Sequence, residues 1–139
     1  MKKILIIEDE NFISELYARA LRKAGYEVTV MISGDDGQTA ALTDNFDLIL
    51  LDLLVPGLSG IEILHKLRGG DKPAIHSKIV ITTNLDQDEE NRADVERLAD
   101  GYLIKAEITP KQLVSIIDQM FSQMEAGDQP VIKQPAPDA

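Results

Sequence analysis

Apolar and polar positions follow two different periods along the chain. Short runs of leucine and β-branched residues, such as Ile4 to Ile7 and Leu48 to Leu51, alternate with longer segments in which apolar residues return every three or four positions. The runs are typical of strands buried on both faces, and the longer segments of amphipathic helices. We expect strands at 4–7, 27–31, 47–52, 79–83 and 102–105, and helices at 11–24, 33–42, 59–67, 88–99 and from 109 onward.

Turn and capping signals separate these segments. Gly25 follows the first helix, and Pro56-Gly57 follows the third strand. Thr109-Pro110 has the form of a helix cap followed by proline at the first helical position. Five strand–helix units with short connections predict an α/β, doubly wound fold in which helices cover both faces of a parallel five-stranded sheet.

Helical spacing predicts an apolar face on two of the helices. In the first helix this face comprises Phe12, Leu16, Ala20 and Leu21. The last helix carries a longer stripe that indicates mostly core packing, although its edge could serve a dimer. This stripe consists of Leu113, Ile116, Ile117, Met120 and Phe121.

The composition is that of one ordinary domain. The chain has 139 residues, 44% of them hydrophobic, no cysteine and a formal net charge of -10. Disulfides and thiolate chemistry are therefore excluded, and the negative charge argues against direct nucleic-acid binding. No apolar stretch is long enough to span a membrane, so we expect a cytoplasmic protein. Residues 1–124 are expected to form the domain, and residues 125–139 a disordered tail or linker stub.

Five polar side chains stand at the carboxyl ends of the expected strands. Glu8 and Asp9 follow the first strand, Asp52 ends the third, Thr83 the fourth and Lys105 the fifth. Because the carboxyl ends of strands in such sheets line one crevice, we expect these residues to be neighbours in space. Three carboxylates, a hydroxyl and an ammonium suit the binding of a divalent cation and a phosphoryl group.

Each of these residues also has a simpler explanation. Adjacent acids are costly to place together without a cation such as Mg2+, but Glu8 and Asp9 could equally be a solvated pair opening a helix. Asp52 ends a fully apolar run, where a carboxylate is paired or reactive, and carboxylates can attack phosphorus. It could also merely initiate a turn. The combination of these groups at four strand ends favours phosphoryl chemistry.

Three motifs resemble those of a known family. The segment from Asp52 to Gly60 is similar to the phosphoacceptor loop of response-regulator receiver domains of two-component signalling. Ile6 to Asp9 matches their acidic pair, and Gly101 to Lys105 their lysine strand. The resemblance extends from Lys2 to about Met124 and implies a flavodoxin-like (βα)5 fold.

The resemblance also implies roles at the site. Asp52 would be phosphorylated, by a histidine kinase or a histidine phosphotransfer protein. Mg2+, for which Mn2+ could substitute, would be held by Asp9, Asp52 and the Leu54 backbone carbonyl, with Glu8 acting through a water molecule. The chain would be a switch that acts on a downstream protein, and not a metabolic enzyme.

A conformational change is implied as well. Phosphorylation would draw Thr83 inward and swing Tyr102 toward the vacated space. This would reshape the face formed by the last two helices and the fifth strand, which could support a phosphorylation-dependent homodimer. We prefer Thr83 to Thr82 because the switch hydroxyl is usually the last residue of the fourth strand, and strand alternation would then direct Thr82 to the opposite face.

The chain departs from the family pattern in two places. Lys105 is followed by Ala106-Glu107, where the family usually has a proline, often with a cis bond. Without proline we expect a trans bond, a differently shaped loop and competition from Glu107 for the ammonium. Leu54 and Leu85 occupy positions that border the phosphoryl group. Neither can orient a water molecule, so we expect slow self-dephosphorylation.

Two other functions stay open. A pseudo-receiver would bind partners independently of phosphorylation, and the Ala106 departure leaves room for this alternative. An aspartate-nucleophile phosphatase would need a second acid two residues after the nucleophile, where this chain has Leu54, and is the weaker alternative. The two histidines, His65 in a helix and His76 in a loop, are expected at the surface and not as phosphodonors.

Overall fold

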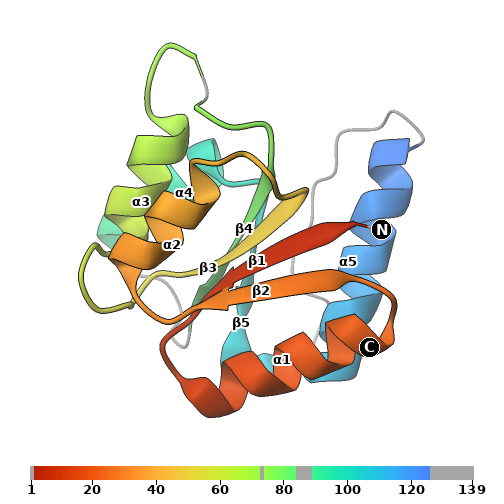
Figure 1. The fold of residues 1–139 in the computed structure, drawn as a ribbon. Coiled ribbons are helices and arrows are strands. Elements are labelled where there is room, and N and C mark those ends of the chain that lie inside the picture. Colours follow the sequence, from red (N-terminus) through yellow and green to blue (C-terminus); the bar gives the residue numbers. More distant parts are fainter. Residues whose placement is uncertain (1, 73, 84–88, 126–139) are drawn as a thin grey trace.

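The computed structural model describes residues 2–72, 74–83 and 89–125, which form an alternating series of strands and helices (Figure 1). The strands are β1 (Lys3–Ile7), β2 (Glu27–Met31), β3 (Leu48–Asp52), β4 (Lys78–Thr83) and β5 (Gly101–Ile104). The helices are α1 (Asn11–Lys23), α2 (Gly34–Ala41), α3 (Gly60–Arg68), α4 (Glu89–Leu98) and α5 (Pro110–Glu125). A turn of 3-10 helix, Lys105–Glu107, joins β5 to α5.

The five strands pair in parallel in the order β2-β1-β3-β4-β5. The chain runs outward from β1 to β2 and then returns past β1 to β3, so the strand order reverses between β1 and β3. In open α/β sheets, ligands bind outside the carboxyl ends of the strands at such a reversal. The topology confirms the predicted flavodoxin-like fold.

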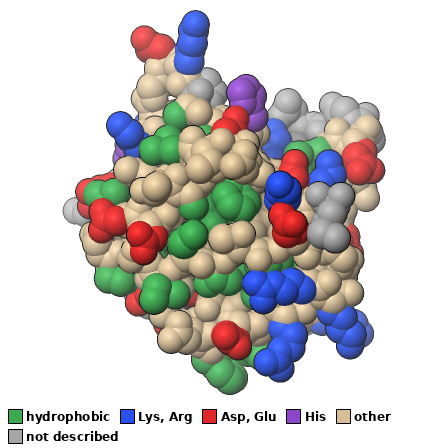
Figure 2. Space-filling model, viewed as in Figure 1, with side chains coloured by type: hydrophobic (Ala, Val, Ile, Leu, Met, Phe, Trp, Pro, Cys, Tyr) green, Lys and Arg blue, Asp and Glu red, His purple; other side chains and the backbone are tan. Residues whose placement is uncertain are grey.

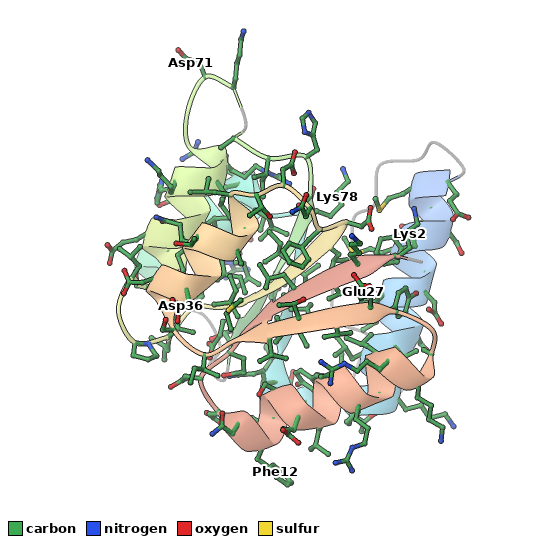
Figure 3. All side chains as sticks on the ribbon, in the orientation of Figure 1. Lys2, Phe12, Glu27, Asp36, Asp71 and Lys78 are labelled. Atoms are coloured by element: carbon green, nitrogen blue, oxygen red, sulfur yellow. The ribbon has the colours of Figure 1, made fainter. Side chains whose placement is uncertain are left out.

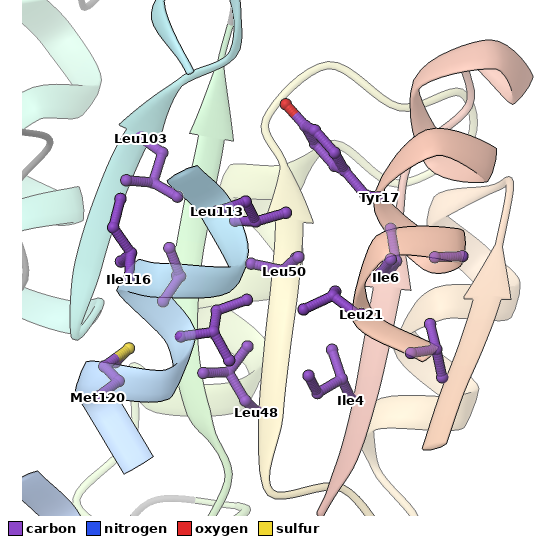
Figure 4. Packing of buried hydrophobic residues seen from close by; sticks show 14 of the residues in the cluster. Ile4, Ile6, Tyr17, Leu21, Leu48, Leu50, Leu103, Leu113, Ile116 and Met120 are labelled. Carbon is purple, nitrogen blue, oxygen red and sulfur yellow. The ribbon is translucent and has the colours of Figure 1, made fainter. Parts of the chain in front are cut away.

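Alternate residues of each strand feed two separate cores. In β1, Ile4 and Ile6 pack in a cluster with residues of α1 and α5, whereas Leu5 and Ile7 pack in a second cluster with residues of α2, α3 and α4. Figure 4 shows the first cluster, and Figure 1 shows α1 and α5 on one side of the sheet with the other helices opposite. Burial on both faces explains why the strands are continuous apolar runs.

Local sequence signals mark the end of α1 and the start of α3. Gly25 closes α1 with a φ of 104°, a left-handed conformation that glycine adopts without strain, and its N–H donates to Arg22 O over 3.0 Å. Ser59 begins α3 with a capping box. Its hydroxyl accepts from Glu62 N over 3.2 Å, and the Glu62 carboxylate accepts from Ser59 N over 3.4 Å.

The buried face of α1 differs from the prediction. Phe12 is 76% exposed and Leu16 37% exposed, and Figure 3 shows Phe12 pointing away from the sheet. The buried stripe instead includes Tyr17, Ala18 and Leu21. Residues three and four positions apart share a helix face, so several stripes of α1 satisfy the helical period. The buried stripe contains the polar residue Ser14, so counting apolar residues along the sequence does not single out this stripe.

The carboxyl-terminal half of α1 is basic. Figure 2 shows Lys and Arg side chains gathered over this part of the molecule, where the helix contains Arg19, Arg22 and Lys23. Positive charge offsets the partial negative charge at a helix carboxyl end. Arg22 also donates from Nη2 to Val28 O over 2.9 Å, which ties the helix to the edge strand β2.

Other predictions for the chain have mixed outcomes. The apolar stripe of α5 is buried, as predicted. Lys105 starts the 3-10 turn and does not end the fifth strand. His65 and His76 are at the surface, with side chains 43% and 96% exposed. Leu85 and the predicted tail after Glu125 lie outside the described residues. None of the helices within the described ranges is long and apolar enough to cross a membrane.

Candidate functional site

The carboxyl ends of β1, β3 and β5 bring three predicted site residues into contact. Lys105 Nζ lies 2.6 Å from Glu8 Oε1 and 3.0 Å from Asp52 Oδ2. All three residues are buried. The predicted proximity of these residues is confirmed, and Lys105 reaches Asp52 although alanine follows it where proline was expected. Glu107, the predicted competitor, is exposed.

A cluster of carboxylates lies at the same place. One oxygen each from Glu8, Asp9 and Asp52 lie within 4.8 Å of one another. Asp9 is exposed, whereas Glu8 and Asp52 are buried, so the cluster opens to solvent on the Asp9 side. Oxygen-only ligands at this spacing suit a hard divalent cation that keeps some of its water.

The charges of this cluster are unbalanced. The pKa of Glu8 is raised to about 7, first by burial and then by Asp52, while Lys105 opposes both effects. Burial alone lowers the pKa of Lys105, but Glu8 and Asp52 outweigh burial, so the pKa of the ammonium is raised. One ammonium therefore faces two buried carboxylates and a third nearby. A cation bound among them would relieve the excess negative charge.

The loop after β3 contacts Asp52 through backbone groups. Leu54 N donates to Asp52 Oδ1 over 3.1 Å, and Gly60 N donates to Leu53 O over 3.0 Å. A Cβ atom at Gly60 would lie 2.4 Å from Asp52 O and 2.5 Å from Leu53 Cα. Only glycine allows α3 to begin this close to the backbone of Asp52. Leu54 itself is 67% exposed.

The register of β3 and β4 corrects the choice between the two threonines. Asp52 pairs with Thr82, not with Thr83. Paired residues of neighbouring strands face the same side of a sheet, and Val80, two residues before Thr82, packs in the α1/α5 cluster. Thr82 thus shares the face of Asp52, whereas Thr83 follows Ile81 on the α2/α3/α4 face. The prediction that Thr82 points to the opposite face is wrong, because it was made without the register.

Tyr102 lies on the second face of the sheet. It pairs with Ile81 in the β4–β5 register and packs, partly buried, against the cluster that contains Val95 and Leu98 of α4. Its ring is therefore on the same face as Thr83 and not on that of Asp52.

The Lys105–Ala106 bond agrees with the expectation from sequence. The described part of the chain contains no cis peptide bond. Sequence reasoning weighed both hydroxyls of the Thr82-Thr83 doublet and chose Thr83, so it missed that Thr82 shares the face of Asp52.

Comparison with models of known protein families identifies the family of this chain. Residues 4–118 match the model of the response regulator receiver domain. This chain belongs to that family. Receiver domains are signalling domains and not conventional enzymes, as the resemblance implied.

Relatives of this receiver domain include longer regulators. The uncharacterized transcriptional regulatory protein YkoG of Bacillus subtilis is 34% identical over 102 residues, which cover 73% of this chain and 43% of YkoG. The phosphate regulon transcriptional regulatory protein PhoB of Pseudomonas aeruginosa is 32% identical over 127 residues, which cover 91% of this chain and 55% of PhoB. The chain thus spans about half the length of these curated relatives.

Solved structures of receiver domains are similar over almost their whole length. A CheY-like receiver domain protein from Methanospirillum hungatei has a TM-score of 0.74 and 29% identity, covering 91% of this chain and 98% of its own. The BeF3-activated N-terminal receiver domain of Klebsiella pneumoniae RstA has a TM-score of 0.72 and 30% identity, covering 85% of this chain and 97% of its own.

Proposed function

We propose that this receiver domain accepts a phosphoryl group on Asp52 from a histidine kinase or a histidine phosphotransfer protein. The observation that carries the proposal is the contact of the Lys105 ammonium with Asp52 Oδ2 at 3.0 Å, beside the carboxylates of Glu8 and Asp9. A nucleophilic carboxylate, a fixed positive charge and a set of metal-binding oxygens are the groups that phosphoryl transfer needs.

The transfer exchanges one bond to phosphorus for another. A carboxylate oxygen of Asp52 attacks the phosphorus atom as the P–N bond of a phosphohistidine breaks, and the bonding electrons leave with the imidazole. Lys105 neutralises negative charge on the phosphoryl oxygens. Asp9, Asp52 and the Leu54 carbonyl would hold Mg2+ or Mn2+, with Glu8 acting through a water molecule. The ion would supply further charge neutralisation when bound.

Thr82 is the better candidate for the hydroxyl that binds the phosphoryl group. It lies directly across the β3–β4 ladder from Asp52 and shares its face of the sheet. It replaces Thr83 in our assignment of the switch residue. Thr83 then remains a residue of the opposite face, close in sequence to the switch.

The output surface comprises α4, β5 and α5. Polar contacts between α3 and α4 include His65 Nε2 with Asp94 Oδ2 at 3.0 Å and Arg68 Nη1 donating to Leu98 O over 3.3 Å. Tyr102 of β5 packs against the cluster that contains Val95 and Leu98 of α4, and it could move when the site is phosphorylated. A change in this surface would alter binding to a downstream protein or to a second copy of the chain.

The remaining assignments concern the bounds of the domain and the place where it works. Residues 1–124 would be the receiver domain, and 125–139 a tail or linker stub. With a formal net charge of -10, the domain would work in the cytoplasm through protein contacts and without binding nucleic acid itself.

Incubation with acetyl phosphate and Mg2+ tests this proposal. The parent chain should gain the mass of one phosphoryl group, and Asp52→Asn, which keeps the size of the side chain, should not. A parent chain that gains no mass under these conditions would instead support the pseudo-receiver alternative.

A further inference from the structure

Tyr17 of α1 is a core residue with a polar end at the phosphorylation site. The residue is 5% exposed and belongs to the cluster between the sheet, α1 and α5. Figure 4 shows its hydroxyl oxygen directed toward the carboxyl ends of the strands, whereas the rest of the ring lies among apolar side chains. Asp52, Glu8 and Lys105 meet at that end of the same face of the sheet.

The hydroxyl of Tyr17 has no hydrogen-bond partner among the residues that the structure describes. Polar groups that are fully buried in proteins are nearly always hydrogen-bonded. Tyr26, the other tyrosine of this side of the molecule, shows the usual pattern, because its hydroxyl donates to Asp118. Among the described residues, the fully buried polar atoms without a partner do not include the Tyr17 oxygen, so this oxygen reaches solvent and is available to a group that moves toward it.

The charged residues of the site influence the pKa of Tyr17. Burial raises the pKa of Tyr17 to about 12, so the phenol stays protonated at neutral pH. Among the charged groups, Lys105 has the strongest influence on this pKa and lowers it, whereas Glu8, Asp52 and Glu10 raise it. These influences agree with the position of the hydroxyl on the face and at the end of the sheet where the three site residues meet.

The ammonium of Lys105 has one hydrogen-bond donor more than the two contacts described above use. Its ammonium carries three protons, and two of them go to Glu8 and Asp52 in the described part of the chain. The third proton is available to a further acceptor, which would fix the direction of the ammonium when it turns toward a phosphoryl group on Asp52. A carboxylate would compete for the charge of the ammonium, whereas a neutral phenol oxygen would accept a proton without that competition.

We propose that Tyr17 is a positioning residue of the phosphorylation site, whose hydroxyl oxygen accepts a hydrogen bond from Lys105 when the ammonium turns from Glu8 toward a phosphoryl group on Asp52. This inference rests on the proposed function. It adds a group from α1 to a site that otherwise consists of residues at strand ends.

Tyr17→Phe is the test variant because it removes one oxygen and keeps the buried ring. With acetyl phosphate and Mg2+, it should be phosphorylated about tenfold more slowly than the parent, the effect of one lost hydrogen bond to a charged group. Tyr26→Phe, which removes a hydroxyl away from the site, should react at the parental rate. Thermal unfolding of both variants verifies that they are folded.

A second measurement does not depend on phosphorylation. The side-chain ammonium resonance of Lys105, assigned by its loss in Lys105→Met, should shift in Tyr17→Phe and not in Tyr26→Phe, both without ligand and with Mg2+ and beryllofluoride. A role limited to packing would leave this resonance in place. Parental phosphorylation kinetics in Tyr17→Phe, or an unmoved Lys105 resonance, would overturn the inference. If the parent gains no phosphoryl group, the proposed function fails, and the resonance in the ligand-free protein still decides whether Tyr17 and Lys105 are coupled.

Discussion

Thr82 and Asp52 are direct partners in the β3–β4 ladder, and their side chains leave the same face of the sheet. This relationship places one hydroxyl beside the proposed phosphoacceptor and the next one, Thr83, on the other side of the sheet. It makes the two threonines experimentally distinguishable.

Thr82→Ala should slow phosphorylation of Asp52 by acetyl phosphate about tenfold, because a hydrogen bond to a charged phosphoryl oxygen is lost. Thr82→Ser retains the hydroxyl and should recover most of the rate. Thr83→Ala should have a much smaller effect. Rates come from intact mass against time, and the reverse ranking of the two alanine variants would restore Thr83 as the switch residue.

Gly60→Ala should destabilise the domain by about 1–3 kcal/mol, because the new methyl group collides with backbone and not with a flexible side chain. The colliding atoms are Asp52 O at 2.4 Å and Leu53 Cα at 2.5 Å. Gly70→Ala is the matched control, since its methyl group would meet nothing closer than Lys72 O at 3.6 Å. Urea unfolding of both variants measures the difference; equal stabilities would contradict the described approach of α3 to Asp52.

Phe12→Ser should change the free energy of unfolding by less than about 0.5 kcal/mol, as expected for an exposed position. Leu21→Ala, on the buried stripe of the same helix, should cost about 2–5 kcal/mol through lost apolar burial and a cavity. Chemical denaturation of the two variants tests which stripe of α1 faces the core. A large loss from Phe12→Ser would favour the face predicted from sequence.

Asp44→Asn should weaken the link between the loops that precede β3 and β4, by less than about 1 kcal/mol because the pair is largely at the surface. Asp44 Oδ1 accepts from His76 N over 2.8 Å, and Oδ2 lies 2.7 Å from His76 Nδ1. These contacts with His76 lower the pKa of Asp44 from its ordinary 3.8.

The pH dependence of this effect has a definite sign. A carboxyl group whose pKa is lower in the folded protein stabilises it above the ordinary value and loses that contribution as the pH falls through the folded pKa. The stability difference between the parent and Asp44→Asn should therefore be present at pH 6 and shrink below pH 3.8. A difference that grows on acidification would be incompatible with the pair.

Leu54→Asn should shorten the lifetime of the aspartyl phosphate, since the exposed leucine beside Asp52 cannot orient a water molecule and a carboxamide can. The lifetime is measured by intact mass after removal of acetyl phosphate. Leu54→Met, which stays apolar, serves as the control. Equal lifetimes in all three proteins would show that this position does not limit hydrolysis.

The success of sequence reasoning at the site has a specific cause. Asp52 and Lys105 are 53 positions apart, but each follows an apolar run, and the carboxyl ends of parallel strands meet at one edge whatever the details of pairing. The strands themselves were predictable because burial on both faces excludes polar residues from them. The glycine and serine signals at Gly25 and Ser59 act within a few residues, so they too could be read locally.

Sequence alone determined the order of the elements, the kind of sheet and the convergence of Glu8, Asp52 and Lys105, since these follow from local hydrophobic period and from a general property of parallel sheets. Tertiary structure alone decided that Thr82 shares the face of Asp52, that Phe12 is exposed and that the Tyr17 hydroxyl is directed toward the carboxyl ends of the strands. Alternation and helical period relate residues within one element, but the face that each element turns to its neighbours depends on strand register and helix packing. Those are set by contacts between segments far apart in the chain, and two adjacent threonines or two competing helix stripes look alike until such contacts are known.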